Sequence, residues 1–213
     1  MRSRSATRPF ARAVALLAGA LVAARAAPAR AEPQATVGLT LGAAGAGLHR
    51  SIWQSTAFHL GIHGDVLFGR SSNADFGIGP YAEVLTNGFD EIQFGGGVSG
   101  LLPVLDTFPI VVSAGAYGRR QASRSPGLLP VTESYGLEPG LAGELFFGSR
   151  SYNFHAPYVM TAGLIAQMRY GLGASKETSI VLGAQVDFAI LSLPFVFLIN
   201  AARGGSSETA PVR

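Results

Sequence analysis

The chain has 213 residues, of which 48% are apolar and only 14% charged, with 28 glycines, no cysteine and a formal net charge of +3. Its mean hydropathy of +0.31 excludes a disordered chain, and its length fits one domain with short attachments. Without cysteine it cannot be a small protein held together by disulfides.

Residues 1–31 predict a secretory signal peptide. Four arginines between positions 2 and 12 form a positive segment, and an apolar run follows at Ala13–Ala24. This run has the length of a signal-peptide core and is too short for a transmembrane helix. Ala29-Arg30-Ala31 then provides a small-x-small cleavage site.

Cleavage after Ala31 would reverse the sign of the net charge. It removes six arginines and no acidic residue, so 16 basic residues fall to 10 while 13 acidic residues remain, a net charge of −3. The basic stripe that a nucleic-acid-binding surface needs is then absent from the sequence. We therefore expect no nucleic-acid partner.

Beyond residue 31, apolar side chains alternate with small or polar ones in eight segments. This alternation is typical of membrane strands, whose two faces meet different surroundings. It predicts an all-β fold, a single eight-stranded antiparallel up-and-down transmembrane β-barrel at 32–203, followed by a polar tail at 204–213. The predicted strands are Ala35–Ala43, Ala57–Gly69, Asn73–Thr86, Asp90–Leu102, Phe108–Gly118, Ser134–Phe147, Ala156–Gly171 and Glu177–Leu191.

The connections between these strands alternate in length. Longer ones near 45–56 and 121–133 contrast with tight turns at 69–72 and 105–107. Barrels of the outer membrane show this asymmetry, with short periplasmic turns and longer outer loops. Asn87-Gly88 is a strong hairpin signal between the third and fourth strands.

Alternation alone also fits a water-soluble barrel with its faces inverted, such as a periplasmic lipocalin-like barrel that binds an apolar ligand. The sequence favours a barrel whose apolar faces contact lipid and whose polar faces line the lumen. The polar faces are rich in glycine and carry few charges, which suits a narrow lumen. Those faces carry both signs, as buried charges require. The predicted polar network of the lumen is His63, Asp65, Glu83, Tyr117, Arg119, Glu138, Glu144, Arg169 and Asp187.

Aromatic residues near the ends of the apolar faces give a third reason for lipid outside. Membrane barrels carry girdles of aromatic side chains at both interfaces. The predicted interface residues are Phe58, Phe68, Tyr135, Phe147, Tyr158 and Tyr170.

A signal peptide followed by eight glycine-rich alternating strands resembles the small eight-stranded outer-membrane β-barrel proteins of Gram-negative bacteria, over Gln34–Leu193. The resemblance implies a location in the bacterial outer membrane, insertion by the barrel assembly machinery and a mostly plugged lumen. We expect outer-membrane lipids and lipopolysaccharide as further partners, the latter at the arginines between 119 and 124, and we expect a monomer. The chain departs from the pattern at its end, because Pro194 and the apolar Phe195–Ile199 segment follow the last strand.

Histidine and glycine motifs give little sign of chemistry. His59 and His63 share a strand face but lie about 13 Å apart, too far for one metal ion. His63 and Asp65 are close enough for a hydrogen-bonded pair, and a metal ion at His63 would need ligands from neighbouring strands. Gly95–Gly97 lies inside a strand, so it predicts close strand packing and not a nucleotide site. We predict no metal and no cofactor.

The alternative hypothesis of an enzyme depends on two residues of the first loop. His49 and Ser51, with Asp90 or Glu133 as an orienting acid, have some similarity to outer-membrane lipid hydrolases that use these residue types at the outer rim. No glycine-framed nucleophile elbow occurs in the sequence. We therefore predict a non-enzymatic protein with a structural, surface-interaction or narrow-pore role.

Overall fold

The computed structural model describes residues 33–48, 52–105, 107–121, 136–150, 158–173 and 176–204. The predicted signal peptide and all of the predicted tail at 204–213 except Gly204, which ends the last helix, lie outside the described residues. The elements are β1 (Gln34–Leu48), β2 (Ser55–Leu67), β3 (Gly77–Asn87), β4 (Glu91–Leu102), β5 (Ile110–Gln121), β6 (Glu138–Arg150), β7 (Thr161–Gly171), β8 (Glu177–Asp187) and α2 (Phe188–Gly204).

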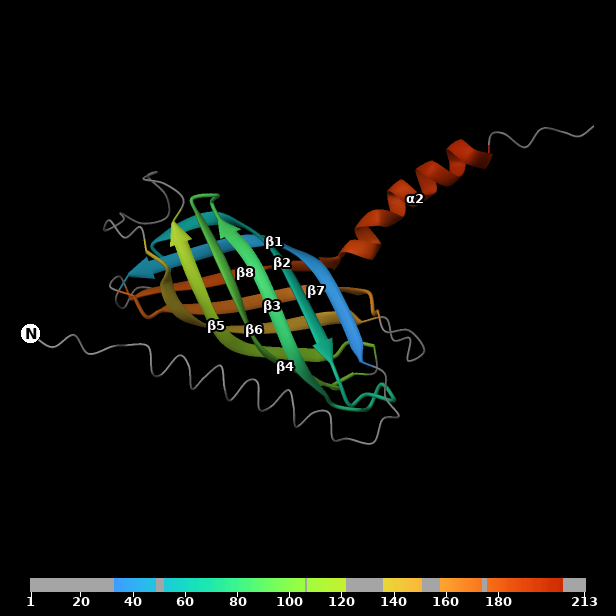
Figure 1. Cartoon of the computed structure of the whole chain (residues 1–213), viewed down its shortest axis with the longest axis horizontal. Helices are drawn as coiled ribbons and strands as arrows, with labels where there is room; N and C mark the ends of the chain where they lie inside the picture. Colours follow the sequence, from blue (N-terminus) through green and yellow to red (C-terminus); the bar gives the residue numbers. More distant parts are fainter. Residues whose placement is uncertain are drawn as a thin grey trace, which may run out of the picture.

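The eight strands form one closed barrel (Figure 1). Each strand pairs antiparallel with the next in the chain, and β8 pairs antiparallel with β1, from Gly38 opposite Asp187 to Leu48 opposite Glu177. Closure leaves no sheet edge with unpaired backbone groups. The predicted eight-stranded, antiparallel, up-and-down topology is confirmed.

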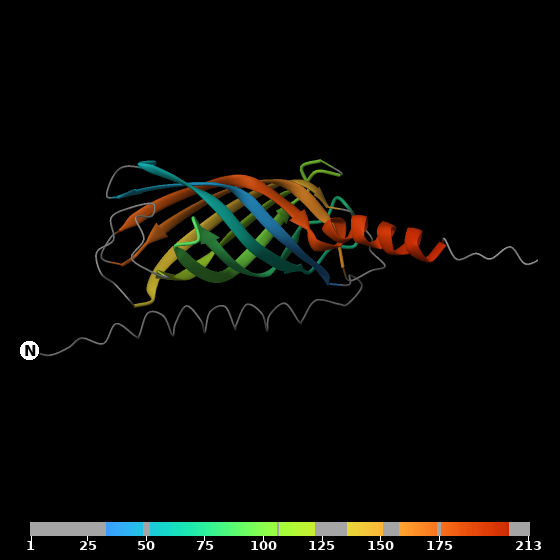
Figure 2. The ribbon, with the colours of Figure 1, turned by 90° about the horizontal axis from the view of Figure 1, so that it is seen from above.

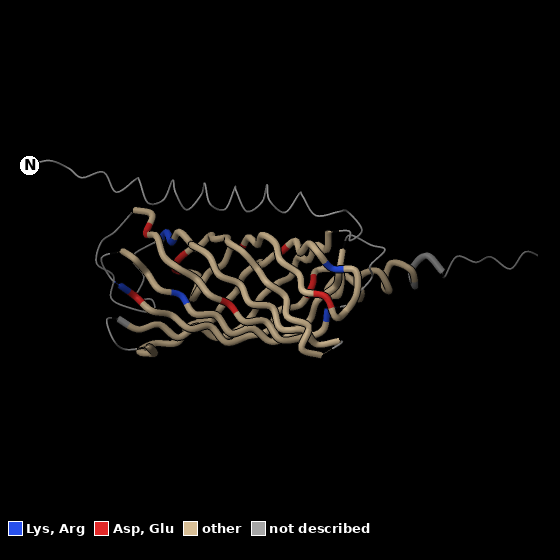
Figure 3. Tube along the Cα trace, turned by 90° about the horizontal axis from the view of Figure 1, so that it is seen from below, with Lys and Arg blue, Asp and Glu red and all other residues tan. Residues whose placement is uncertain are grey.

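Apolar side chains cover the outside of the barrel. Leu41, Ile62 and Leu182, near the middles of β1, β2 and β8, keep 37%, 48% and 53% of their surface exposed. Charged residues occur only at scattered positions along the strands (Figure 3). Many of them, including Arg119 and Arg169, are buried inside. The lipocalin-like alternative, which needs an apolar interior and a polar exterior, does not match this arrangement.

Glycines allow β4 and β5 to approach closely. A Cβ at Gly97 would lie 2.1 Å from the carbonyl oxygen of Ala114, and one at Gly115 would lie 2.2 Å from that of Gly96. Gly97 and Gly115 are direct partners in the ladder. Only glycine fits such an approach, as the glycine run in the sequence predicted.

The first connection is shorter than predicted, because β1 continues to Leu48. Gly45 leaves room for Trp53 to pack over this extension, since any Cβ at Gly45 would lie 2.0 Å from the indole. The Gln54 amide donates to the carbonyl of Ala46 at 2.7 Å, which begins the return strand.

The third strand begins later than the predicted Asn73. The carboxylate of Asp75 accepts hydrogen bonds from the amide and hydroxyl of Ser71 and the amide of Ser72, each at 2.8 Å. These bonds fold the segment into a turn, so the ladder of β3 starts only at Gly77. Strands β5, β6 and β7 likewise begin a few residues later than predicted.

The turn between β3 and β4 is shifted by one residue from the predicted Asn87-Gly88 centre. Gly88 and Phe89 have positive φ angles of 65° and 64°, whereas Asn87 ends β3. A non-glycine residue at positive φ is uncommon. The Phe89 ring stacks on Phe58 with ring centroids 6.0 Å apart.

The eighth strand ends at Asp187, so the prediction that it runs to Leu191 is wrong. Asp187 accepts a hydrogen bond from the Ala189 amide at 2.7 Å, which caps the first turn of α2. The residues that follow are apolar without alternation, and they form a helix that projects beyond one end of the barrel (Figure 2). Pro194 lies within it. Among the described residues, no helix is long and apolar enough to cross a membrane.

Replacing Gly97 with valine should prevent closure of the barrel between β4 and β5, because its Cβ would collide with backbone atoms. We expect the refolded fraction, measured as the heat-modifiable band on gels without boiling, to fall sharply. Gly100→Val is the control, since a Cβ at Gly100 meets nothing closer than 4.0 Å. Equal refolding of both variants would contradict the argument.

The Asp75 turn makes a prediction about pH. Hydrogen bonds, first from the Ser71 hydroxyl, lower the pKa of Asp75 from 3.8 to about 2. A lowered folded-state pKa stabilises the turn fully above its ordinary value, and this contribution is lost as the pH falls through about 2. NMR titration of the carboxyl group should show this pKa, and Ser71→Ala should move it back toward 3.8. An ordinary pKa in the unmodified protein would refute the turn.

Candidate functional site in the barrel lumen

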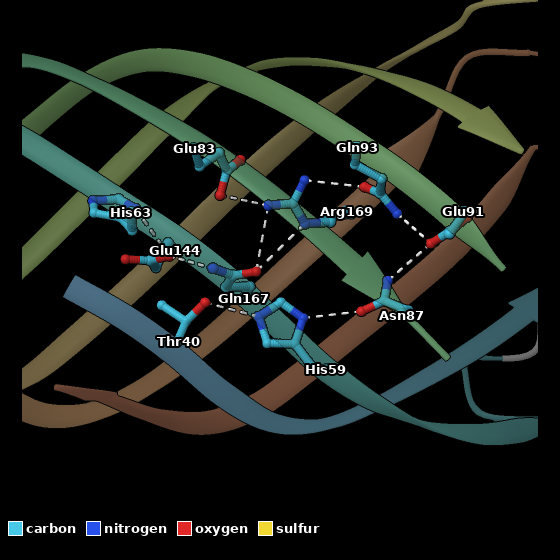
Figure 4. Close-up of polar contacts among 10 residues, drawn as sticks. All are labelled: Thr40, His59, His63, Glu83, Asn87, Glu91, Gln93, Glu144, Gln167 and Arg169. Atoms are coloured by element: carbon cyan, nitrogen blue, oxygen red, sulfur yellow. Dashed lines mark hydrogen bonds and ion pairs between the residues drawn. The ribbon is translucent and has the colours of Figure 1, made fainter. Parts of the chain in front are cut away.

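A continuous polar network crosses the middle of the lumen (Figure 4). It begins at His59, which contacts Thr40 at 3.2 Å and Asn87 at 2.9 Å through its two ring nitrogens. Both partners come from the strands on either side of β2. His59 therefore ties β1 and β3 to the strand between them and is fully buried.

The network continues from Asn87 toward Arg169. The Asn87 amide donates to Glu91 at 2.9 Å, and the Gln93 amide donates to the same carboxylate oxygen at 2.5 Å. Arg169 in turn donates to the Gln93 carbonyl at 3.1 Å and forms an ion pair with Glu83 at 2.6 Å. Because β7 and β3 lie on opposite sides of the ring, Arg169 joins two walls of the barrel.

Arg119 is the centre of a second cluster near the end of the barrel where β5 finishes. It forms ion pairs with Glu177 at 2.5 Å, Glu138 at 2.7 Å and Glu91 at 3.6 Å. These acids come from β8, β6 and β4, so one guanidinium holds four strands. Three carboxylates around one buried cation make this arginine difficult to replace.

Arginines also close the opposite end of the lumen. Arg150, at the end of β6, forms an ion pair with Asp65 of β2 at 2.7 Å and donates to the Thr36 hydroxyl at 3.3 Å. Arg70 follows β2, is 1% exposed and donates to the Gln34 side chain at 3.0 Å. Buried apolar side chains pack nearby as a cluster of Leu67, Leu101, Val111, Phe146 and Ile165.

Three ligand-type side chains converge at one point of the central network. His63, Glu83 and Glu144 each offer an atom within 4.8 Å of the others, and all three side chains are buried. His63 and Glu83 are direct partners in the β2–β3 ladder, whereas Glu144 lies on β6. In the part of the chain that the structure describes, this is the group of donors that could hold a metal ion.

The predicted lumen residues lie inside the barrel. Tyr117 is 7% exposed and stacks beneath Arg169, whose guanidinium carbon lies 5.1 Å from the ring centroid. Asp187 is fully buried and accepts a hydrogen bond from Tyr158 at 2.7 Å. The hydrogen-bonded pair suggested for His63 and Asp65 is not formed, because Asp65 binds Arg150.

The predicted aromatic residues fall at both ends of the barrel wall. Phe58 and Tyr170 lie near one end, whereas Phe147 and Phe68 lie near the other. The Phe147 ring contacts Phe108 in a tilted arrangement, with ring centroids 6.2 Å apart. Tyr158 belongs to this second end, but its hydroxyl points to Asp187. Tyr135 lies outside the described residues.

Sequence reasoning missed several members of the network. Arg150 was missed because the sixth strand was predicted to stop at Phe147, although the inward face of Glu144 continues at every second residue to Arg150. Arg70 was placed in a turn, and nothing in the pattern shows that it folds back over the lumen. His59 and Gln93 are also buried members of the network, although neither is among the predicted lumen residues.

The structure describes only one of the four residues proposed for a hydrolase site, Asp90. Asp90 lies in the turn after β3. His49, Ser51 and Glu133 lie outside the described residues, so their arrangement stays a prediction.

Two solved structures of Ail from Yersinia pestis are similar to this chain. The backbone structure of the outer-membrane protein Ail in a phospholipid bilayer nanodisc is 11% identical, covers 71% of this chain and 98% of that chain, and gives a TM-score of 0.35. The crystal structure of Ail, the attachment invasion locus protein, with the heparin analogue sucrose octasulfate is 10% identical, covers 73% and 99%, and gives 0.40. No family model and no curated protein matches the chain.

Replacing Arg119 with methionine should destabilise the barrel more than the same substitution at the next residue, Arg120. Arg119→Met leaves three carboxylates without their shared cation, which should cost about 3–5 kcal/mol of unfolding free energy. Urea unfolding of the refolded protein in lipid vesicles measures this cost. Arg120→Met is the control, since Arg120 is exposed. The cluster would be unimportant if both variants unfolded at the same urea concentration.

Proposed function

We propose that the protein is an outer-membrane β-barrel with a closed lumen, whose role is structural or a surface interaction and not enzymatic. The observation that carries the proposal is the distribution of side chains on a closed barrel. Apolar residues such as Ile62 and Leu182 are exposed around its waist, while arginines and carboxylates pair inside. Water would favour the reverse arrangement, whereas lipid favours this one.

The paired lumen supports a role without an open channel. Arg169 and Arg150 each reach across the interior to a carboxylate on another wall, and Phe146 with its apolar neighbours fills one end. Eight strands leave an interior only wide enough for side chains. Planar bilayers containing the refolded protein should therefore show no steady conductance, and a stable open channel would argue for a pore instead.

The proposed contact between the outer wall of the barrel and lipid can be tested by introducing an arginine at two positions along that wall, one at its middle and one at its end. Leu182 lies at the middle of β8, and Leu172 lies just beyond the end of β7, with nearly equal exposures of 53% and 52%. In lipid vesicles, Leu182→Arg should reduce the unfolding free energy by about 2–4 kcal/mol and Leu172→Arg by about 0–1 kcal/mol.

A water-facing exterior would give a different result. Both arginines would then be solvated, and the two variants would unfold alike. Recovery of the unmodified protein from the soluble periplasmic fraction without detergent would also contradict the proposal. The barrel assembly machinery, lipopolysaccharide and outer-membrane lipids remain the expected partners of such a protein, and the expected state is a monomer.

A further inference from the structure

The point where His63, Glu83 and Glu144 meet has the composition of a metal site. An imidazole and two carboxylates face one another with ligand atoms within 4.8 Å (Figure 4). His63 and Glu83 come from neighbouring strands, and Glu144 reaches them from β6 across the lumen. Exposure is 2%, 5% and 8% for the three residues, so water competes little for these atoms.

Two of the atoms in this cluster lack a hydrogen-bond partner. They are Nδ1 of His63 and Oε1 of Glu83, both fully buried. His63 Nδ1 lies 3.6 Å from the nearest Glu144 oxygen, beyond ordinary hydrogen-bond length. Buried polar atoms normally have partners, and an ion between these side chains would supply one to each.

The remaining atoms of the cluster are held in place by neighbours. Arg169 pairs with Oε2 of Glu83, which leaves Oε1 available, and the Gln167 amide donates to Glu144. The Tyr81 ring stacks on His63 with centroids 5.2 Å apart and an interplanar angle of 10°. Metal ligands in proteins are commonly oriented by hydrogen bonds such as the one from Gln167 to Glu144.

Charge also favours a cation here. Glu83 forms an ion pair with Arg169, whereas the ion pair that Glu144 forms among the described residues is with His63, at 3.6 Å. A neutral imidazole, the form that binds metals, supplies no positive charge to Glu144. With a neutral imidazole, ionised Glu83 and Glu144 together with Arg169 carry a net charge of −1, which attracts a cation to the free lone pair of the imidazole.

We propose that His63, Glu83 and Glu144 bind a divalent transition-metal ion, with Zn²⁺ as the ion to test first. Three nitrogen and oxygen ligands with one position for water suit zinc, and the imidazole disfavours Ca²⁺ and Mg²⁺. Bonds of about 2.0–2.2 Å require the ligand atoms to move closer together than 4.8 Å. Gly95, opposite Glu83 in the ladder, leaves room for that carboxylate to turn.

The test is zinc binding by the full mature chain, refolded in detergent with Zn²⁺ or with a chelator. Zinc is added before refolding because the ligands are buried. The background carries His49→Gln and His155→Gln, which remove the two histidines outside the described residues. We expect one zinc per chain after dialysis, and at a free concentration of about 100 times Kd the unfolding equilibrium should shift about 100-fold toward the folded state.

Single substitutions at His63, Glu144 and Gln167 test whether the zinc ion is bound at this cluster. Glu144→Gln keeps the shape of the side chain but removes an anionic ligand, and His63→Gln removes the imidazole. Both should abolish the zinc-dependent shift, whereas Gln167→Ala should weaken the affinity about 10- to 100-fold. His59→Gln is the matched control, because His59 is buried on the same strand with both ring nitrogens already bonded.

A second measurement needs no variant of the cluster. Co²⁺ in place of Zn²⁺ should give visible absorption bands of a nitrogen- and oxygen-ligated ion, which Zn²⁺ then removes by exchange. Absence of stoichiometric zinc from the background protein would overturn the proposal. Zinc binding that survives both His63→Gln and Glu144→Gln would also overturn it, because the ion would then lie elsewhere.

Discussion

Pairing between the first and last strands is the constraint on which the rest of the structure depends. At the centre of this seam Gly42 faces Gly183, and a Cβ at either position would lie within 2.3 Å of a carbonyl oxygen of the other strand. Two glycines therefore let β8 approach β1 closely enough to close the ring. Closure pairs the backbone of every strand on both sides, which is what a chain surrounded by lipid must achieve.

Closure also decides what can occupy the interior. A ring of eight strands leaves space only for side chains, so each inward charge must find a partner at a fixed distance. The arginines meet this requirement because their long side chains span the lumen, as Arg169 does to Glu83 and Arg150 to Asp65. The polar interior is thus a set of ties between opposite walls. In water-soluble barrels, apolar side chains packed in the interior hold opposite walls together instead.

The number of strands and the direction of their faces follow from the sequence because alternation has a period of two along the whole barrel. Several strand ends do not follow, since local hydrogen bonds decide where β3 begins and where β8 ends. The Asp75 carboxylate makes a turn of residues that alternate well enough to resemble a strand. The reverse occurs at Arg150, where a strand continues through residues that resemble a turn.

The inward polar faces of the strands were predictable for the same reason, but the partners that meet within the lumen were not. Alternation places His63 and Asp65 on one face, two residues apart, and suggests that they interact. The stagger between opposite walls instead brings Arg150 to Asp65 and Glu144 to His63. Which residues meet across a lumen depends on the tilt and register of all eight strands, and these are properties of the closed ring.

Asp187 shows how the end of the barrel and the start of the helix depend on one side chain. Its carboxylate lies inside the barrel wall, where it accepts a hydrogen bond from Tyr158, and the same oxygen caps α2 through the Ala189 amide. The capped helix then carries Phe195 and Phe197, which are 70% and 69% exposed, away from the barrel. The apolar exterior of the strands thus continues onto α2. On β8, the inward polar face thus ends at Asp187, the residue immediately before the helix.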